Sequence, residues 1–204
     1  MSGESAPQWR TRWQGARMRR VRSGWVIAAA IGLTVLVAPP QASAATCGPT
    51  AVAQTSGPYY KAGAPSRMTV TQSDTVGTPL ILTGTILDSA CRPLPGATVD
   101  FWQADGRGRY DNAGYRLRGR QVTDSAGRYR LTTVIPGQYP GRTEHIHVKI
   151  TPRGGRTFTT QLYYPGSTHN SEDGIFDPAM LVTVTSNSPK RMQATYRFVL
   201  PARG

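Results

Sequence analysis

Residues 129–151, YRLTTVIPGQYPGRTEHIHVKIT, decide the fold class of this chain. Residues 129–134 and 145–151 are short runs rich in β-branched and other apolar side chains, a composition that favours β-strands. Between them stand Pro136-Gly137 and Pro140-Gly141, pairs that end regular structure and favour turns. The segment therefore predicts two strands joined by a loop.

The same alternation of short apolar runs and turn signals continues in both directions, and no long amphipathic helical pattern interrupts it after residue 44. Strands of this number and length are sufficient for two packed sheets around one core. We therefore expect an all-β fold, a two-sheet β-sandwich over residues 66–204, preceded by an irregular Pro/Gly-rich lead-in at residues 45–65. The expected strands are residues 67–72, 80–87, 98–103, 119–123, 129–134, 145–151, 157–163, 180–184 and 192–200.

Residues 1–44 have the three-part composition of a signal peptide. Six arginines precede an apolar stretch at residues 25–37, which is too short for a convincing membrane span. Ala42-Ser43-Ala44 then matches a signal peptidase site, and Arg19-Arg20 leaves both the Sec and the twin-arginine route open. We expect a secreted, extracellular protein that meets the membrane only through this segment, before cleavage.

The chain is strongly basic, with 24 Lys and Arg against 11 Asp and Glu and a formal net charge of +13. Removal of residues 1–44 takes away six arginines and one glutamate, so the remaining chain is still basic. Its arginines are scattered singly, with no basic run or helical stripe, and we expect no nucleic-acid partner. The basic surface either steers anionic substrates such as aromatic carboxylates or serves solubility.

Cys47 and Cys91 are the two cysteines of the chain. An exported protein enters an oxidising compartment, where a cysteine pair normally forms a disulfide. We expect a structural Cys47–Cys91 bond that pins the start of the exported chain to the domain. Metal ligation by these cysteines is the lesser alternative.

A His-x-His pair, with two tyrosines before it in sequence, predicts a metal site. His145 and His147 project to the same face of their strand, while Ile146 points to the other face. Neutral imidazoles alone do not select one transition metal. Tyr110 and Tyr139 would add two phenolate oxygens, which ionise at neutral pH only beside a strong Lewis acid and favour a hard trivalent ion such as Fe(III).

Two other interpretations of the histidines stay open at this point. His-x-His in a strand and tyrosine after glycine or proline are both common in proteins without metal. A cupin-like or zinc hydrolase site is a further alternative, although it usually requires another histidine or a carboxylate ligand nearby. His169 is the third histidine of the chain; it stands in a stretch of loop composition, and we expect it to be a surface residue.

The chain resembles the intradiol ring-cleavage dioxygenases, of which protocatechuate 3,4-dioxygenase shows the nearest pattern. The order Tyr, Tyr, His-x-His is specific to that family, whereas the other matching blocks are individually weak. The resemblance covers most of the chain after residue 44. The other matching blocks are Gly57-Pro58-Tyr59-Tyr60, Asp100-Phe101-Trp102-Gln103-Ala104, Thr123-Asp124-Ser125-Ala126-Gly127-Arg128-Tyr129 and Thr160-Gln161-Leu162-Tyr163.

This resemblance implies a non-haem enzyme with one Fe(III) ion per chain. It implies a prealbumin-like sandwich that inserts both atoms of O2 into a catechol, between the two hydroxyl-bearing carbons, to give a cis,cis-muconate-type diacid. Small-molecule catechols and O2 would be its substrates. The preferred catechol and the oligomeric state are left open.

The resemblance also implies individual roles for site residues. The metal ligands would be Tyr110, Tyr139, His145 and His147, and Tyr139 would leave the metal when substrate arrives and act as a base. Arg142 would stabilise negative charge on the substrate and contact it. Gln161 would form hydrogen bonds near the reacting atoms, and Tyr59 and Tyr60 would line one wall of the substrate cleft.

Prealbumin-like sandwich modules without catalysis are the alternative to the enzyme. Residues 84–139 share turn and strand patterns with such modules, in which Tyr129 and Tyr139 would be core or corner residues and no metal would bind. Those modules need neither Tyr110 nor the His-x-His pair, so the enzyme is favoured. Gly141 departs from the family, which commonly carries tryptophan there, and we expect a more open pocket with broad tolerance of catechols.

Overall fold

The computed structural model describes residues 47–202, which form the β-sandwich expected from the sequence. The expected signal peptide, residues 1–44, lies outside the described residues. In the described part of the chain the elements are β1 (Pro79–Leu87), β2 (Thr98–Trp102), β3 (Arg118–Val122), β4 (Arg128–Val134), β5 (His145–Thr151), β6 (Phe158–Tyr163), the 3-10 helices η1 (Thr168–Ser171) and η2 (Pro178–Met180), β7 (Thr183–Ser188) and β8 (Arg191–Val199).

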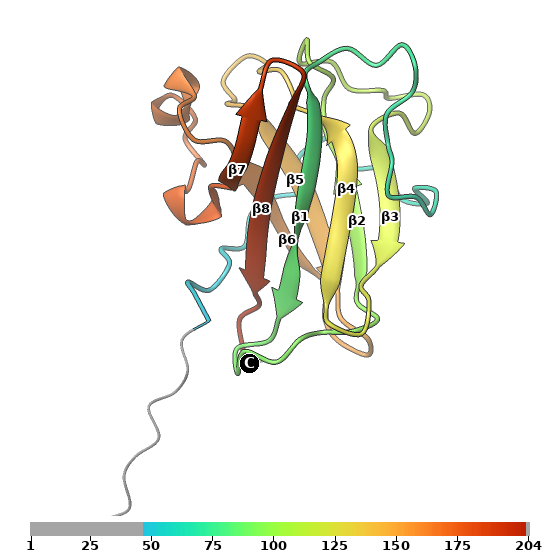
Figure 1. Ribbon diagram of the computed structural model, residues 1–204, viewed down its shortest axis with the longest axis vertical. Coiled ribbons are helices and arrows are strands. Elements are labelled where there is room, and N and C mark those ends of the chain that lie inside the picture. Colours follow the sequence, from blue (N-terminus) through green and yellow to red (C-terminus); the bar gives the residue numbers. More distant parts are fainter. Residues whose placement is uncertain (1–46, 203–204) are drawn as a thin grey trace, which may run out of the picture. The chain divides into compact units, whose positions relative to one another are not determined.

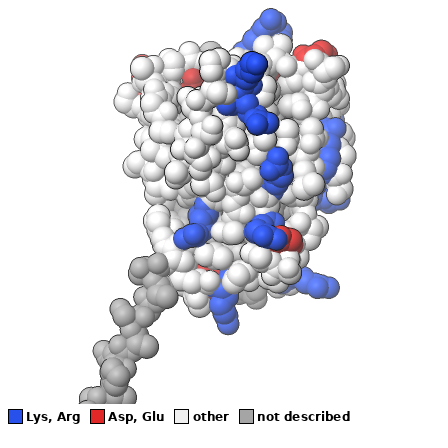
Figure 2. Space-filling view, viewed as in Figure 1, with Lys and Arg blue, Asp and Glu red and all other residues white. Residues whose placement is uncertain are grey.

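The strands form two four-stranded sheets that face one another, as Figure 1 shows. One sheet has the order β4-β1-β8-β7 and the other β3-β2-β5-β6. All neighbouring strands are antiparallel except β1 and β8, which run parallel. We call the first of these sheets the β1 sheet and the second the β5 sheet. Figure 2 shows the β1 sheet from outside, with more basic than acidic side chains on this face.

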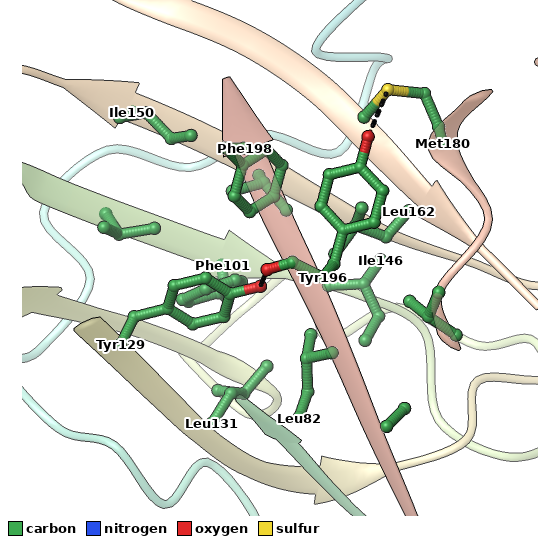
Figure 3. Close-up of a cluster of buried hydrophobic side chains, with 14 of the residues drawn as sticks. Leu82, Phe101, Tyr129, Leu131, Ile146, Ile150, Leu162, Met180, Tyr196 and Phe198 are labelled. Atoms are coloured by element: carbon green, nitrogen blue, oxygen red, sulfur yellow. Dashed lines mark hydrogen bonds between the residues drawn. The ribbon is translucent and has the colours of Figure 1, made fainter. Parts of the chain in front are cut away.

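The core lies between the inner faces of the two sheets. Its side chains come from alternate positions of the strands, because successive residues of a strand point to opposite faces. Figure 3 shows the aromatic part of this core, in which Phe198 packs against Tyr129 and Tyr196 with ring centres 5.7 and 4.7 Å away. The Tyr129 hydroxyl donates a hydrogen bond to the Tyr196 carbonyl, at 2.9 Å. This bond therefore satisfies the buried phenol group of Tyr129.

Two expected strands are corrected by the structure. Residues 67–72 form no strand: this segment makes only isolated bridges nearby, Ser66 with Arg120 of β3 and Thr69 with Thr132 of β4. It therefore crosses from one sheet to the other instead of pairing along either. The expected strand at 180–184 is displaced, because η2 occupies Pro178–Met180 and the Asp177 side chain caps it through the Ala179 amide. The strand of this region is β7, Thr183–Ser188.

The segment that precedes β1 is held to the domain at several points. Cys47 and Cys91 form the expected disulfide, with Cα atoms 5.5 Å apart. The Ala51 amide donates to the Val199 carbonyl and the Gln54 amide to the Thr159 carbonyl, both at 2.8 Å. This segment reaches the outer face of the β5 sheet and covers part of it, where the Gln161 side chain donates to the Thr55 carbonyl. Among the described residues, no helix is long and apolar enough to span a membrane.

Candidate metal centre

The outer face of the β5 sheet carries the histidine pair. In the register of β5, Trp102 of β2 lies opposite His147, and Gln161 of β6 lies opposite His147 on the other side. Residues paired in this way point to the same face, so these side chains gather on one surface. Ile146 points the other way and is part of the apolar core, as expected.

The two imidazoles meet at their Nε2 atoms, which lie 3.1 Å apart. Nδ1 of His145 lies 2.7 Å from the Thr143 carbonyl oxygen. Because a carbonyl can only accept, Nδ1 carries the proton and the lone pair of Nε2 is directed into the site. The indole of Trp102 stacks on His147 with ring centres 4.8 Å apart and planes 2° from parallel, which fixes the orientation of that ring.

Tyr110 and Tyr139 come from two loops that touch one another. The Gly137 amide donates to the Asp105 carbonyl at 2.8 Å. A side chain at Gly137 would place its Cβ 2.6 Å from the Gly106 carbonyl oxygen, so only glycine permits this close approach. The contact brings the two phenol rings to 5.9 Å between centres. The Tyr139 hydroxyl is 3.4 Å from Nε2 of His145.

Burial keeps all four of these groups neutral without a cation. It lowers the pKa of His145 to about 4 and, with the charge of neighbouring groups, that of His147 well below its ordinary value. Burial, reinforced by the Tyr139 phenol, raises the pKa of Tyr110, and burial also raises the pKa of Tyr139. The imidazoles are thus in the state that a metal requires, whereas the phenols need a strongly acidic cation to lose their protons.

The four residues fit a bound metal ion. Two nitrogen ligands about 2.1 Å from one ion, at a right angle, lie about 3.0 Å apart, close to the separation of the two Nε2 atoms here. The Tyr110 hydroxyl is buried and has no hydrogen-bond partner of normal geometry, as expected of a group whose partner is a ligand. The structure therefore brings together all four ligands expected from the sequence. No group of three or more His, Cys, Asp and Glu side chains suited to a metal occurs among residues 47–202.

Arg142 lies beside the histidine pair and is held on three sides. Its Nε donates to the carboxylate of Asp173 at 2.9 Å, Nη1 to the Tyr139 hydroxyl at 3.3 Å, and Nη2 to Oε1 of Gln161. Nε2 of Gln161 donates to the Thr55 carbonyl at 3.1 Å, so that amide is oriented as well. Arg142 and Gln161 thus lie together beside the histidine pair and Tyr139.

Asp173 is a site residue that sequence analysis missed. Its side chain is 1% exposed and also accepts from the Thr143 amide at 3.1 Å, so one carboxylate joins the Arg142 turn to the loop after η1. Nothing in the spacing of Asp173 relative to the ligands marks it, because the contact spans 31 residues. The signal that could have found it is the need of a buried guanidinium for an acidic partner.

Arg118 is a second buried cation that sequence analysis missed. It is 1% exposed, and its guanidinium donates to the carbonyls of Tyr59 at 2.6 Å and Asp111 at 3.0 Å. It lies 5.9 Å from the centre of the Tyr110 ring. Burial lowers the pKa of Arg118. Its charge therefore stands beside the ring that would become negative on binding a metal.

The two tyrosines expected to line the cleft occupy different places. Tyr59 stacks on Tyr110, with ring centres 4.3 Å apart, and meets Tyr139 edge-on at 6.0 Å, so it covers both phenols. Tyr60 instead packs edge-on against Trp102, and Nζ of Lys149 lies 3.3 Å from its ring centre. Of the two, Tyr59 is the one that contacts Tyr110 and Tyr139.

A cavity of about 390 Å³ opens beside the centre, between the Tyr139–Arg142 turn and η1. A side chain at Gly141 would point into open space, in agreement with the open pocket expected there. His169 lines this cavity and its side chain is 34% exposed, so it is not the plain surface residue expected from the sequence. The residues around the cavity are Gln138, Tyr139, Pro140, Gly141, Arg142, His169 and Glu172.

Comparison with known proteins agrees with this fold. The family model described as Dioxygenase matches residues 55–202. Catechol 1,2-dioxygenase from Acinetobacter baylyi is 32% identical over 146 residues, 57% of this chain and 47% of that protein. The protocatechuate 3,4-dioxygenase beta chain from Burkholderia cepacia is 32% identical over 125 residues, 52% of this chain and 53% of that one. The chain therefore belongs to the intradiol dioxygenase family.

A solved structure shares the architecture over its whole length. It is the dioxygenase domain of a dioxygenase and carbohydrate-binding protein fusion from the cellulolytic bacterium Streptomyces sp. SirexAA-E. The two are 44% identical with a TM-score of 0.72, over 76% of this chain and all of that one. By contrast, the chain spans only about half the length of the two curated relatives above.

Proposed function

We propose that the protein is an intradiol dioxygenase, an oxidoreductase that cleaves catechols with O2 at a non-haem Fe(III) centre. The observation that carries this proposal is the convergence of Tyr110, Tyr139, His145 and His147 on one buried point, with a Tyr110 hydroxyl that lacks any other partner. The names of the curated relatives, catechol and protocatechuate dioxygenases, support the substrate class.

Bound iron would supply a Lewis acid that holds the catechol as its anion and makes it reactive toward O2. The chain's own residues would bind the ring, accept its protons and stabilise its charge. The balanced outcome is the insertion of both oxygen atoms between the two hydroxyl-bearing carbons, which gives a cis,cis-muconate-type diacid and consumes no reductant.

The two tyrosines are held unequally, and this supports different roles for them. Tyr110 is fixed by the stacked ring of Tyr59 and by the nearby Arg118 guanidinium. Tyr139 stands on a turn of four residues, and its hydroxyl has a weak 3.3 Å contact from Arg142. Tyr139 is therefore the residue that can move and accept a proton from a catechol hydroxyl at its phenolic oxygen, while Tyr110 stays in place.

Arg142 and Gln161 would act on the bound substrate. The guanidinium is kept close to the Tyr139 oxygen by Asp173, so a positive charge is already in place where negative charge develops on the catechol oxygens. The Gln161 amide is oriented by Thr55 and Arg142 and limits the positions that a substrate oxygen can take.

We also propose that the protein is exported after cleavage behind Ala44 and acts outside the cell. The composition of residues 1–44 supports export, and the Cys47–Cys91 disulfide supports an oxidising destination. Mass spectrometry of protein from the culture medium tests this: a mature chain that begins at Ala45 is expected, whereas an uncleaved chain retained in the cells would contradict it.

The experiment that tests the proposed function is a visible absorption spectrum of the purified iron-loaded protein, before and after anaerobic addition of catechol. We expect a tyrosinate-to-Fe(III) band that moves to longer wavelength with catechol, and oxygen uptake when air is admitted. Tyr110→Phe should alter the band and remove the uptake. A colourless protein without oxygen uptake after iron loading would overturn the proposal and favour a prealbumin-like binding module.

A further inference from the structure

The cavity beside Gly141 is lined by several polar side chains, and these bear on which catechols the centre accepts. We infer that it is a subsite for a side chain at ring position 4 of the catechol, and that it selects chains ending in a hydrogen-bond donor, an ammonium or hydroxyl group, over chains ending in a carboxylate. The inference rests on the proposed function, since Tyr139 and Arg142 belong both to the metal centre and to the cavity wall.

Arg142 is the one positive group among the residues that line the cavity, and each of its three nitrogens already donates one hydrogen bond. Its three donor nitrogens face Asp173, Tyr139 and Gln161. The charge of its guanidinium is offset by the adjacent Asp173 carboxylate, 2.9 Å away. A substrate carboxylate in this cavity would therefore gain less from Arg142 than it would from an unpaired guanidinium.

The remaining polar groups of the cavity attract donors. Glu172 is exposed, and among residues 47–202 no ion pair to its carboxylate is present. Nδ1 of His169 is buried without a hydrogen-bond partner and lies 3.9 Å from the Glu144 carboxylate. Glu144 itself accepts from the hydroxyls of Thr143 and Ser167. One unpaired carboxylate, that of Glu172, thus lines the cavity, and a second, that of Glu144, lies next to His169. This arrangement favours an ammonium or hydroxyl over an anion.

This local charge is opposite to that of the chain as a whole. The basic surface would bring anionic substrates to the protein in general, but the approach past Glu172 is acidic. Selection between side chains should therefore depend on this wall and not on the net charge. A single exposed ion pair changes binding by about fivefold, which is the size of effect to expect from Glu172.

The test compares oxygen uptake with 4-(2-aminoethyl)catechol and with 3-(3,4-dihydroxyphenyl)propionate, using unsubstituted catechol as the reference for each variant. We expect the wild-type ratio of kcat/KM to favour the amine, Glu172→Gln to lower that ratio about fivefold, and Glu172→Lys to lower it further. Asp124→Asn is the matched control, because it removes one negative charge at an exposed turn between β3 and β4 that is remote from the site. An equal drop in the control would overturn the inference.

A second measurement does not depend on turnover. Tyramine, which carries the aminoethyl chain but is not a catechol, is titrated into the metal-free protein while the imidazole signals are followed by NMR. A saturable shift of the His169 signal that Glu172→Gln weakens supports the subsite, and 3-(4-hydroxyphenyl)propionate should give none. Turnover of catechol with no His169 shift and no change of the ratio would reject the subsite alone, whereas loss of all turnover with the shift intact would reject the proposed function alone.

Discussion

The outer faces of the two sheets in this sandwich differ in how far they are buried. Along β1 and β8 of the β1 sheet, buried and more exposed residues largely alternate, as expected when one face packs on the core and the other meets solvent. In β5 the first four residues are all buried, and in β6 five of six are. The β5 sheet is therefore covered on both faces along β5 and β6.

This difference shows how a plain sandwich acquires a site. The β1 sheet buries one apolar face and leaves a polar one in water. The β5 sheet adds a second buried layer, made by the segment around Tyr59 and the loop around Asp173, and that layer is polar. The core thus supplies stability from one face of the sheet, and the chemistry is built on the other face of the same strands.

The largest expected effect separates the two faces of β5 directly. His147→Gln should lower oxygen uptake at least about 1,000-fold, about 4 kcal/mol, because it removes a ligand while leaving the core side of the strand intact. Ile146→Val, one residue away on the core face, is the matched control and should cost about 0.5–1.5 kcal/mol of unfolding free energy. Iron content and chemical denaturation measure the two effects, and a Gln variant that keeps its iron would break the comparison.

The second effect concerns the core that both sheets share. Phe198→Ala should reduce the unfolding free energy by about 3–5 kcal/mol, because its side chain is fully buried between Tyr129 and Tyr196. Urea denaturation followed by fluorescence measures the change. Val122→Ala in β3 is the control, since that side chain is 62% exposed and should alter stability little. A loss below about 1 kcal/mol for Phe198→Ala would mean that the core is not where stability resides.

The third effect lies in the polar layer. Asp173→Asn should lower kcat about 10- to 100-fold with a smaller change of KM, because Arg142 loses the carboxylate that holds it near Tyr139. The wavelength of the tyrosinate band should also move, since a charge near Tyr139 is displaced. Asp124→Asn, which removes one charge at a remote turn, should show neither change. An unaltered kcat in Asp173→Asn would show that Arg142 is placed by Gln161 alone.

The smallest effect is expected at the exposed end of the β1 sheet. Asp88 accepts from the amides of Ala90 and Arg92, both at 2.9 Å, and from the Arg92 side chain at 2.7 Å. These bonds, the Arg92 amide first, hold the pKa of Asp88 below its ordinary value. A lowered pKa stabilises the fold above the unfolded value near about 3.9, and the stability is lost as pH falls through the folded pKa.

Asp88→Asn should therefore cost about 0.2–1 kcal/mol at pH 7, the range of exposed ion pairs. The difference from the wild type should shrink as the pH is lowered below about 3.9. Thermal unfolding at a series of pH values measures this. A difference that grows in acid would contradict the sign of the pKa shift.

The sequence was sufficient for the fold class and for most strands, because strand periodicity is local. It placed β5 at its observed bounds, His145–Thr151, from β-branched residues and the histidine spacing alone. It failed at residues 67–72, where a similar apolar pattern bridges to β3 and to β4 in turn. A local pattern cannot distinguish a strand from a segment that crosses between two sheets.

The site likewise contains residues that could be predicted from the sequence and residues that could not. The histidine pair could be predicted, because residues two positions apart on a strand point to the same face. Asp173 and Arg118 could not be predicted. Asp173 pairs with Arg142, 31 positions away, and Arg118 donates to the Tyr59 carbonyl, 59 positions away. His169 was misplaced for the same reason: its loop composition is that of a surface, and only the fold brings it to the wall beside Arg142.

The turn at Gly141 has a consequence for how this enzyme family can diverge. Gly141 has φ of +76°, a conformation that other residues adopt only at a cost of about 1 kcal/mol or more. A descendant that fills the cavity by a larger residue at this position must therefore accept strain or rebuild the turn around it. Relatives whose substrate range differs because of a substitution at this position should therefore also differ in the neighbouring turn residues.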